Sequence, residues 1–192
     1  MRIWITAAAL TLVAGAAAAG PVDGAVAKGA LFSPKGAQAS IGAQPFLSSS
    51  DIKVLEQVAA TQKYYGAVAL SPDEGLMSEA TFAAANYHAV EPAREAALAA
   101  CNARRKKGSK PCVLVGDILP VGWTKGRPVQ LSTDATAGFE QDYLPAKAPK
   151  ALAGSLETGH WAIATGAGAR EKAVQDCAAK GGAGDCRVLL AD

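Results

Sequence analysis

The sequence predicts an α+β fold built from two copies of an αββαβ unit, in which helix, strand, strand, helix and strand follow one another. The first observation is an internal repeat, because residues between 47 and 75 recur between 131 and 159 at a constant offset and without a gap. Such self-similarity indicates repeated structural units. The recurring residues are Leu47, Ser48, Glu56, Gln57, Lys63, Ala67, Ala69, Ser71 and Gly75, and their counterparts are Leu131, Ser132, Glu140, Gln141, Lys147, Ala151, Ala153, Ser155 and Gly159.

The second observation is the placement of the cysteines. After a short deletion in the second copy, Cys177 corresponds to Cys101 and Cys186 corresponds to Cys112. Each copy therefore has one pair, and we predict the disulfides Cys101–Cys112 and Cys177–Cys186. An even number of cysteines in an exported chain is typical of disulfide bonding. The alternative is a four-cysteine zinc site, although this chain lacks the close cysteine spacing that zinc motifs favour.

The amino terminus predicts export. Met1 and Arg2 precede an apolar stretch that ends in small residues at 17–19, so we expect a cleaved signal peptide over residues 1–19. The stretch is shorter than the roughly 20 apolar residues that a membrane span needs. No later segment is long and apolar enough to span a bilayer, and we expect a periplasmic or secreted protein.

The rest of the chain divides into four segments. Residues 20–46 are rich in Gly, Ala, Ser and Pro without a sustained hydrophobic period, which predicts a flexible leader. The first repeat is expected over 47–119 and the second over 131–192. Residues 120–130, with Trp123 and several Gly and Pro, are the expected linker.

Each repeat is predicted to open with a helix. Ser48 begins a cluster of N-capping residues and Asp51 places an acid in the first turn. Ile52 and Leu55 then fall on one helical face. The second copy shows the same pattern after Ser132.

Two strands should follow in each repeat. Short apolar runs at 64–70 and 150–154 predict buried strands. The stretch 71–75 contains the Pro and Gly of a turn. Alternating patterns over 76–84 and 161–165 predict the second strands. We expect each pair to form a hairpin.

A second helix and a last strand complete each repeat. In the first copy the helix should begin at Glu91 and Pro92, which are favoured in a first turn, and should run past Cys101. The last strands are expected at 112–119 and 186–190. Each copy thus supplies a small three-stranded sheet with helices, and we expect the two copies to pack as one pseudo-symmetric domain.

The densest charge cluster lies at the end of this helix. It consists of Arg104, Arg105, Lys106, Lys107 and Lys110. Such a run is a candidate anion-binding site, and the alternative is a solvated helix end that the helix dipole stabilises. The formal net charge of the whole chain is only +2, which argues against a nucleic-acid-binding protein.

The candidate catalytic residues are few. His88 and His160 do not occupy matching repeat positions, and a catalytic base needs a reachable target and an orienting acid. We expect both to be structural or surface histidines. Ser71 and Ser155 lack the G-x-S-x-G pattern of a nucleophile and are expected in turns. We assign no catalytic, cofactor-binding or metal-binding residue and expect no cofactor.

The first copy resembles a known family. The segment 65–69 (YGAVA), the Ala-rich helix that carries Cys101, and the strand opening at 111–114 (PCVL) resemble a secreted bacterial domain of unknown function. That domain has a GAIA-like strand and two cysteines that frame a helix–strand loop. The second copy, around Cys177 and Cys186, matches it more loosely. The resemblance implies an exported, disulfide-bonded α+β module without an established activity.

These observations favour a non-enzymatic exported module that binds an envelope component or a protein partner. The alternative is a small envelope hydrolase with a histidine/acid site between the repeats, for which His88 and Glu91 are the candidates. The sequence does not predict the identity of the ligand or the oligomeric state.

Overall fold

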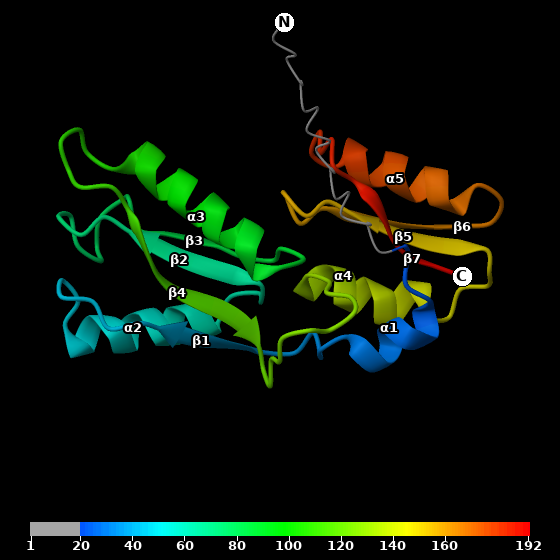
Figure 1. The fold of residues 1–192 in the computed structure, drawn as a ribbon, viewed down its shortest axis with the longest axis horizontal. Helices are drawn as coiled ribbons and strands as arrows, with labels where there is room; N and C mark the ends of the chain where they lie inside the picture. Colours follow the sequence, from blue (N-terminus) through cyan, green and yellow to red (C-terminus); the bar gives the residue numbers. More distant parts are fainter. Residues whose placement is uncertain (1–19) are drawn as a thin grey trace, which may run out of the picture.

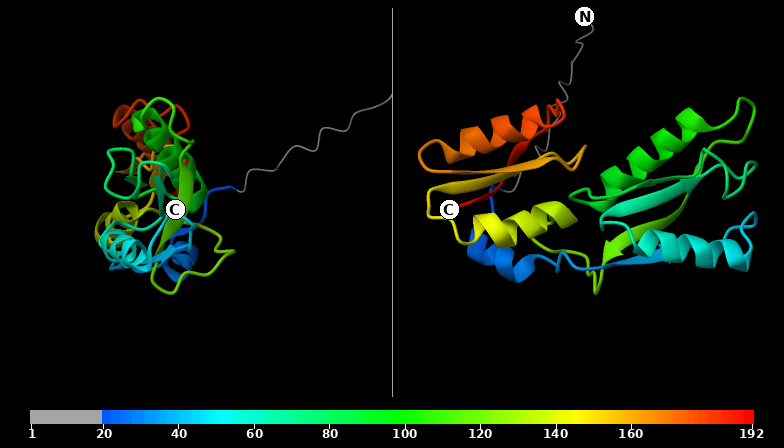
Figure 2. Two further views of the ribbon diagram at one scale, coloured as in Figure 1. Left: turned by 90° about the vertical axis from the view of Figure 1, so that its left-hand side faces the viewer. Right: turned by 180° about the vertical axis from the view of Figure 1, so that it is seen from behind.

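The computed structural model describes residues 20–192, and the predicted signal peptide over 1–19 lies outside these described residues. The described chain forms two antiparallel sheets, one of four strands and one of three, each covered by helices. Figure 1 shows the two sheets side by side with their helices, and Figure 2 shows the same separation from behind. The α+β class is therefore confirmed. No helix within residues 20–192 has the length and apolar character needed to cross a membrane.

Residues 47–119, which we call the first unit, contain the predicted order of elements. These are α2 (Ser49–Ala60), β2 (Gly66–Leu70), β3 (Phe82–Ala84), α3 (Val90–Arg104) and β4 (Val113–Pro120). Strand β2 lies in the centre and pairs antiparallel with both β3 and β4. The predicted hairpin of β2 and β3 is confirmed.

Residues 131–192, the second unit, have the same order. Their elements are α4 (Thr133–Gly138), the π-helical turn η1 (Phe139–Tyr143), β5 (Lys150–Gly154), β6 (Trp161–Thr165), α5 (Ala169–Ala179) and β7 (Arg187–Ala191). Strand β5 is central and pairs antiparallel with both β6 and β7. The first strand of each unit thus lies between the other two.

Helices cover both faces of the first sheet. Ala67 and Ala69 of β2 pack against α3, whereas Val68 and Leu70 pack in the cluster that contains Leu55 of α2. All five residues of β2 are buried. A strand covered on both faces is apolar throughout and does not alternate, which explains the continuous run GAVAL.

The predicted helix starts are confirmed. The side chain of Ser48 accepts the backbone N–H of Asp51, and the carboxylate of Asp51 accepts the backbone N–H of Ser48, which completes a capping box. The side chain of Ser132 caps α4 by accepting the N–H of Ala135, without the reciprocal bond that Asp51 makes in α2. Each cap satisfies backbone donors that a helix leaves free at its first turn.

Both predicted disulfides are present. Cys101 of α3 is bonded to Cys112 just before β4, and Cys177 of α5 is bonded to Cys186 just before β7. Each bond fixes the end of a helix to the start of the strand that follows. The zinc alternative is wrong, because all four cysteines are consumed by these bonds.

Each sheet has one register irregularity. In the first sheet the pairing of β2 with β4 shifts between Val68 and Ala69. In the second sheet the pairing of β5 with β7 shifts between Leu152 and Ala153. These positions correspond to one another under the constant offset that relates the two units in the sequence.

The segment 20–46 differs from the prediction of a flexible leader. It contains a short helix, α1 (Gly24–Ala30), and a strand, β1 (Ala37–Ile41). Strand β1 pairs antiparallel with β4, so the first sheet has four strands where we expected three. Pairing with an existing sheet edge orders this segment, which its own composition does not. We call residues 20–46 the N-terminal strap.

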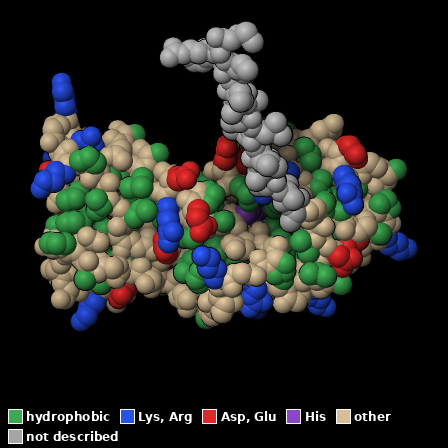
Figure 3. All heavy atoms as spheres, viewed as in Figure 1, with side chains coloured by type: hydrophobic (Ala, Val, Ile, Leu, Met, Phe, Trp, Pro, Cys, Tyr) green, Lys and Arg blue, Asp and Glu red, His purple; other side chains and the backbone are tan. Residues whose placement is uncertain are grey.

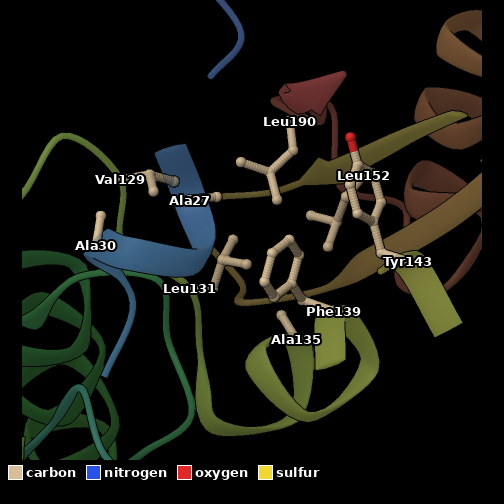
Figure 4. Packing of buried hydrophobic residues seen from close by; sticks show 9 residues of the cluster. All are labelled: Ala27, Ala30, Val129, Leu131, Ala135, Phe139, Tyr143, Leu152 and Leu190. Atoms are coloured by element: carbon tan, nitrogen blue, oxygen red, sulfur yellow. The ribbon is translucent and has the colours of Figure 1, made fainter. Parts of the chain in front are cut away.

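The strap also binds the second unit. The N–H of Val22 donates to the carbonyl of Leu189 at 2.9 Å, and the N–H of Ala191 donates to the carbonyl of Val22 at 3.1 Å. Ala27 and Ala30 of α1 pack into the core of this unit beside residues that include Leu131, Phe139 and Leu190 (Figure 4). The strap therefore pairs with the last strand of each unit, first β7 and then β4.

The predicted second strand of the first unit is shorter than expected. Of the alternating stretch 76–84, only Phe82–Ala84 is a strand. The hydroxyl of Thr81 donates to the carbonyl of Leu76 at 2.7 Å, which closes a compact loop instead. A local side-chain bond of this kind competes with strand pairing.

A buried lysine fixes the end of the chain and the strap to the second unit. The ammonium of Lys150 donates to the carbonyls of Tyr143 at 2.9 Å and Ala146 at 3.0 Å, and it lies 3.5 Å from the carboxylate of Asp192. That carboxylate also accepts the N–H of Gly24 at 2.7 Å. One cation thus holds together η1, β5, the carboxyl-terminal residue and the first turn of α1.

We expect Lys150→Met to lower the free energy of unfolding by about 3 kcal/mol, because it leaves carbonyls and a carboxylate without their cation in a largely buried site. Lys147→Met, at an exposed lysine, should change it by less than about 0.5 kcal/mol. Urea unfolding at neutral pH measures both values. Equal stability of the two variants would contradict the structural role of Lys150.

Candidate functional site

The two units meet at a polar seam formed by loops of the first unit and the start of α4. The amide of Asn86 donates to the carboxylate of Asp134 at 3.0 Å, and the N–H of Asp134 donates to the side-chain oxygen of Asn86 at 3.1 Å. The N–H of Tyr64 donates to the hydroxyl of Thr133 at 3.0 Å, and the hydroxyl of Tyr64 donates to that of Thr136 at 2.9 Å. Paired polar groups therefore hold the units in one relative position.

The backbone at this seam is in an uncommon conformation. Tyr65 has φ of 52° and Asn86 has φ of 70°, and both lie in the left-handed region that non-glycine residues seldom adopt. Asn tolerates this region, whereas a tyrosine there is strained. The carbonyl of Tyr65 accepts the N–H of Tyr87 at 3.1 Å. The seam contacts thus hold both loops in place.

His88 lies between the two units and is 1% exposed. Its Nδ1 accepts the N–H of Ser132 at 3.0 Å, and its Nε2 lies 3.2 Å from the carbonyl of His160. Since a carbonyl can only accept, Nε2 carries the proton and Nδ1 does not. Both ring nitrogens are therefore used in bonds to the second unit.

Burial lowers the pKa of His88 from 6.5 to about 4, so the ring is neutral near pH 7. No carboxylate in residues 20–192 is hydrogen-bonded to this ring. A neutral imidazole with both nitrogens engaged has no free lone pair to accept a proton from a substrate. In this geometry His88 serves as a contact between the two units.

The ring of His88 also explains a difference between the two units. A Cβ atom on Gly154 would lie 2.7 Å from Nε2 of His88, which is too close for a real contact. The corresponding position in the first unit is Leu70, which is fully buried. The second unit therefore needs glycine at 154 to admit the histidine of the first.

A cavity of about 290 Å³ lies beside His88. Its wall comes from four parts of the chain: the strap, the two residues before α3, the linker and strand β7, with Leu156 adding to it. Figure 3 shows a hollow between the two halves of the molecule, with histidine atoms visible inside it. The cavity exists only where both units, the linker and the strap meet.

Two arginines, Arg127 of the linker and Arg187 of β7, line this cavity, and its wall contains no Asp or Glu. Within residues 20–192 neither arginine forms an ion pair with a carboxylate. Arg127 donates to the carbonyl of Ala30 at 3.2 Å and stacks over the ring of Phe32 at 4.6 Å. The cavity is therefore positively charged, and one of its cations is held in a fixed orientation.

Part of the basic run at the end of α3 is engaged in local contacts. Arg104 stacks over Phe82 at 4.5 Å, and Arg105 donates to the carbonyl of Ser109. The N–H of Lys110 donates to Asp73 at 2.8 Å, which lowers the pKa of that carboxyl. Glu74 accepts the N–H of Lys106 at 2.9 Å. Nearby acids thus offset part of this positive charge.

The structure does not bring together the histidine and acid of the hydrolase alternative in a hydrogen bond. Glu91 lines a separate cavity of about 260 Å³. There Arg94 forms an ion pair with Asp117. The site that a hydrolase would need between the units holds His88 without an orienting acid, so the geometry does not favour this alternative.

The two turn serines lie where the sequence predicts. Ser155 is fully buried, and its hydroxyl accepts the N–H of Thr158 at 3.1 Å and contacts Asp185. Ser71 is also fully buried, and its carbonyl accepts the N–H of Gly75 at 3.2 Å. Both serines therefore stabilise turns. In the described part of the chain no three His, Cys, Asp or Glu residues are grouped as metal ligands would be.

Sequence reasoning missed the residues that line the cavity. Arg127, Gln130 and Arg187 belong to no motif. The first two lie in the linker, and most of the second unit separates them in sequence from Arg187. The only signal was the composition of the linker, because a long irregular segment inside a compact protein is often functional.

No protein-family model, no curated protein and no solved structure matches this chain. The function therefore has to be inferred from the geometry of the protein itself.

The burial of His88 predicts a pH dependence of stability. The folded protein gives up the ring proton with a pKa of about 4, whereas the unfolded chain does so near 6.5. Between these values the unfolded chain binds a proton that the folded protein does not, so the free energy of unfolding should fall as the pH falls from 6.5 to 4, by on the order of 3 kcal/mol.

Urea unfolding across this pH range measures the effect. His88→Gln should remove most of this slope, although it lowers the stability at neutral pH. His160→Gln should keep the slope. An unchanged slope in His88→Gln would show that other groups cause the pH dependence.

Proposed function

We propose that this protein is an exported, disulfide-stabilised binding module whose ligand site is the cavity between the two units. The observation that carries the proposal is the lining of that cavity, which combines two arginines without carboxylate partners and a neutral, fully bonded histidine. A cavity with convergent polar groups and no assembled catalytic residues supports binding more than catalysis.

The rigidity of the surrounding structure supports this proposal. Each unit carries one disulfide, and the polar seam fixes the two units against each other. A preformed site loses less conformational entropy when a ligand binds. The units therefore serve as a frame that holds the cavity open.

We also propose that the two units arose by duplication of one αββαβ module, related to the secreted domain of unknown function that the first unit resembles. The shared order of elements, the two equivalent disulfides and the equivalent register shifts at Val68/Ala69 and Leu152/Ala153 support the duplication. Repeated units that pack together commonly bind ligands where they meet.

The expected setting is the periplasm or the extracellular space. The two disulfides are compatible with an oxidising compartment, and the predicted signal peptide supports export. The ligand would then be an envelope component or part of a partner protein.

Native mass spectrometry tests the proposal, using protein recovered from the envelope extract of the cells that produce it. We expect a protein whose mass corresponds to a chain that begins at Gly20, with two disulfides formed in place of four thiols. We expect an additional mass from a bound ligand. Ala89→Leu should release that ligand, because Ala89 lines the cavity and the larger side chain fills it. Ala103→Leu, at an exposed position of α3, the helix that Ala89 precedes, is the control.

Two results would contradict the proposal. Ala89→Leu could retain the same added mass as Ala103→Leu, which would place the ligand elsewhere. Both variants and the natural protein could also carry no added mass when sprayed directly from the extract, which would leave the cavity without a ligand in its own environment.

A further inference from the structure

The geometry points to a carboxylate as the group that the cavity recognises, attached to a short apolar body, with Arg127 and Arg187 as its anchors. This inference rests on the proposed function and specifies its ligand. The shared chemistry is that of a free aliphatic acid or of the carboxyl terminus of a peptide.

The charge that lines the cavity favours an anionic ligand. Two guanidinium groups line a space of about 290 Å³, and no acidic side chain lies in its wall. Charges of one sign in a partly enclosed cavity raise the local concentration of ions of the other sign. Since neither arginine pairs with a carboxylate of residues 20–192, an anionic ligand would meet cations that no internal partner has neutralised.

The residues around Arg127 hold its guanidinium in a fixed orientation. Its Nε donates to the hydroxyl of Thr124 at 3.3 Å, its Nη1 donates to the carbonyl of Ala30 at 3.2 Å, and its Cζ lies over the ring of Phe32. The other terminal nitrogen, Nη2, has no hydrogen-bond partner among the described residues. A guanidinium held in this way keeps donors free for an oxygen of the ligand, and little entropy is lost on binding.

Apart from the two arginines, the wall of the cavity is uncharged and largely apolar. Val22, Val129 and Leu189 give it an apolar surface, and the neutral ring of His88 adds no charge. The volume is at the low end of the range for small-molecule sites, roughly 300 Å³. A short aliphatic chain or one apolar amino-acid side chain fits this wall, whereas a large polyanion exceeds the volume of this partly enclosed cavity.

Gly20 strengthens the argument through the predicted cleavage. It lies at the wall of the cavity. Cleavage between residues 19 and 20 would create an α-ammonium group there, which would add a third cation beside the two arginines. The processed protein should therefore bind an anion more tightly than a protein that carries extra residues before Gly20.

Calorimetric titration of the processed protein, residues 20–192, tests the inference with defined probes. Hexanoate and N-acetyl-alanyl-valine carry the carboxylate, and hexanamide and the carboxyl-terminal amide of the same dipeptide are their neutral matches. We expect at least one acid to bind about tenfold or more tightly than its amide, and the binding should weaken as the salt concentration rises. The preferred acid distinguishes the free-acid source from the peptide source.

Substitutions locate the binding. Arg187→Gln, at an exposed side chain, should weaken the binding of the preferred acid about tenfold or more without changing the melting temperature. Arg127→Gln should also weaken the binding of the preferred acid about tenfold or more. It should in addition lower the melting temperature, because it removes the contact of Arg127 with α1. Arg170→Gln removes one positive charge from the exposed face of α5, outside the cavity, and should leave the affinity unchanged.

The inference is overturned if neither acid binds at millimolar concentration, if acids and amides bind equally, or if Arg187→Gln and Arg170→Gln have the same affinity. Its failure can be told apart from that of the proposed function. A ligand that is retained from the envelope extract, released by Ala89→Leu and unaffected by Arg187→Gln would keep the cavity as the site and reject the carboxylate as its ligand.

Discussion

The pairing of the N-terminal strap with the last strand of each unit is the interaction on which the rest of the structure depends. Strand β1 covers the edge of β4, and Val22 bonds to the edge of β7. The strap thus shields edges that would otherwise present unpaired backbone groups. The strap binds the second unit through Val22 and then the first unit through β1. The two units are thus connected twice, by the strap and by the linker between them.

The seam and the cavity follow from the position that the strap and linker impose. His88 of the first unit enters the space that Gly154 leaves in the second, and its burial there keeps the ring neutral. The same placement brings Arg127 and Arg187 to one wall although they belong to different parts of the chain. A site of this kind cannot exist in a single unit, which gives a physical reason for the chain to contain two.

Most of the local structure could be predicted because it depends on short-range chemistry. The caps at Ser48 and Ser132, the buried strands, the turns and the disulfide pairs all involve residues close in sequence. The strap was missed because its small residues carry no periodic signal, and strand pairing with a distant edge supplies its order. The short β3 was missed because the bond between Thr81 and Leu76 favours a loop over the alternating pattern.

The αββαβ order of each unit and the positions of the helix starts follow from propensity and capping, which act over a few residues. The pairing of the cysteines follows from the repeat, which places one pair in each unit. The four-stranded first sheet, the neutral state of His88, the buried contacts of Lys150 and the arginine-lined cavity became visible only in the folded protein. These features depend on which segments, distant in the sequence, come into contact. The free energy of those contacts comes from residues throughout the fold.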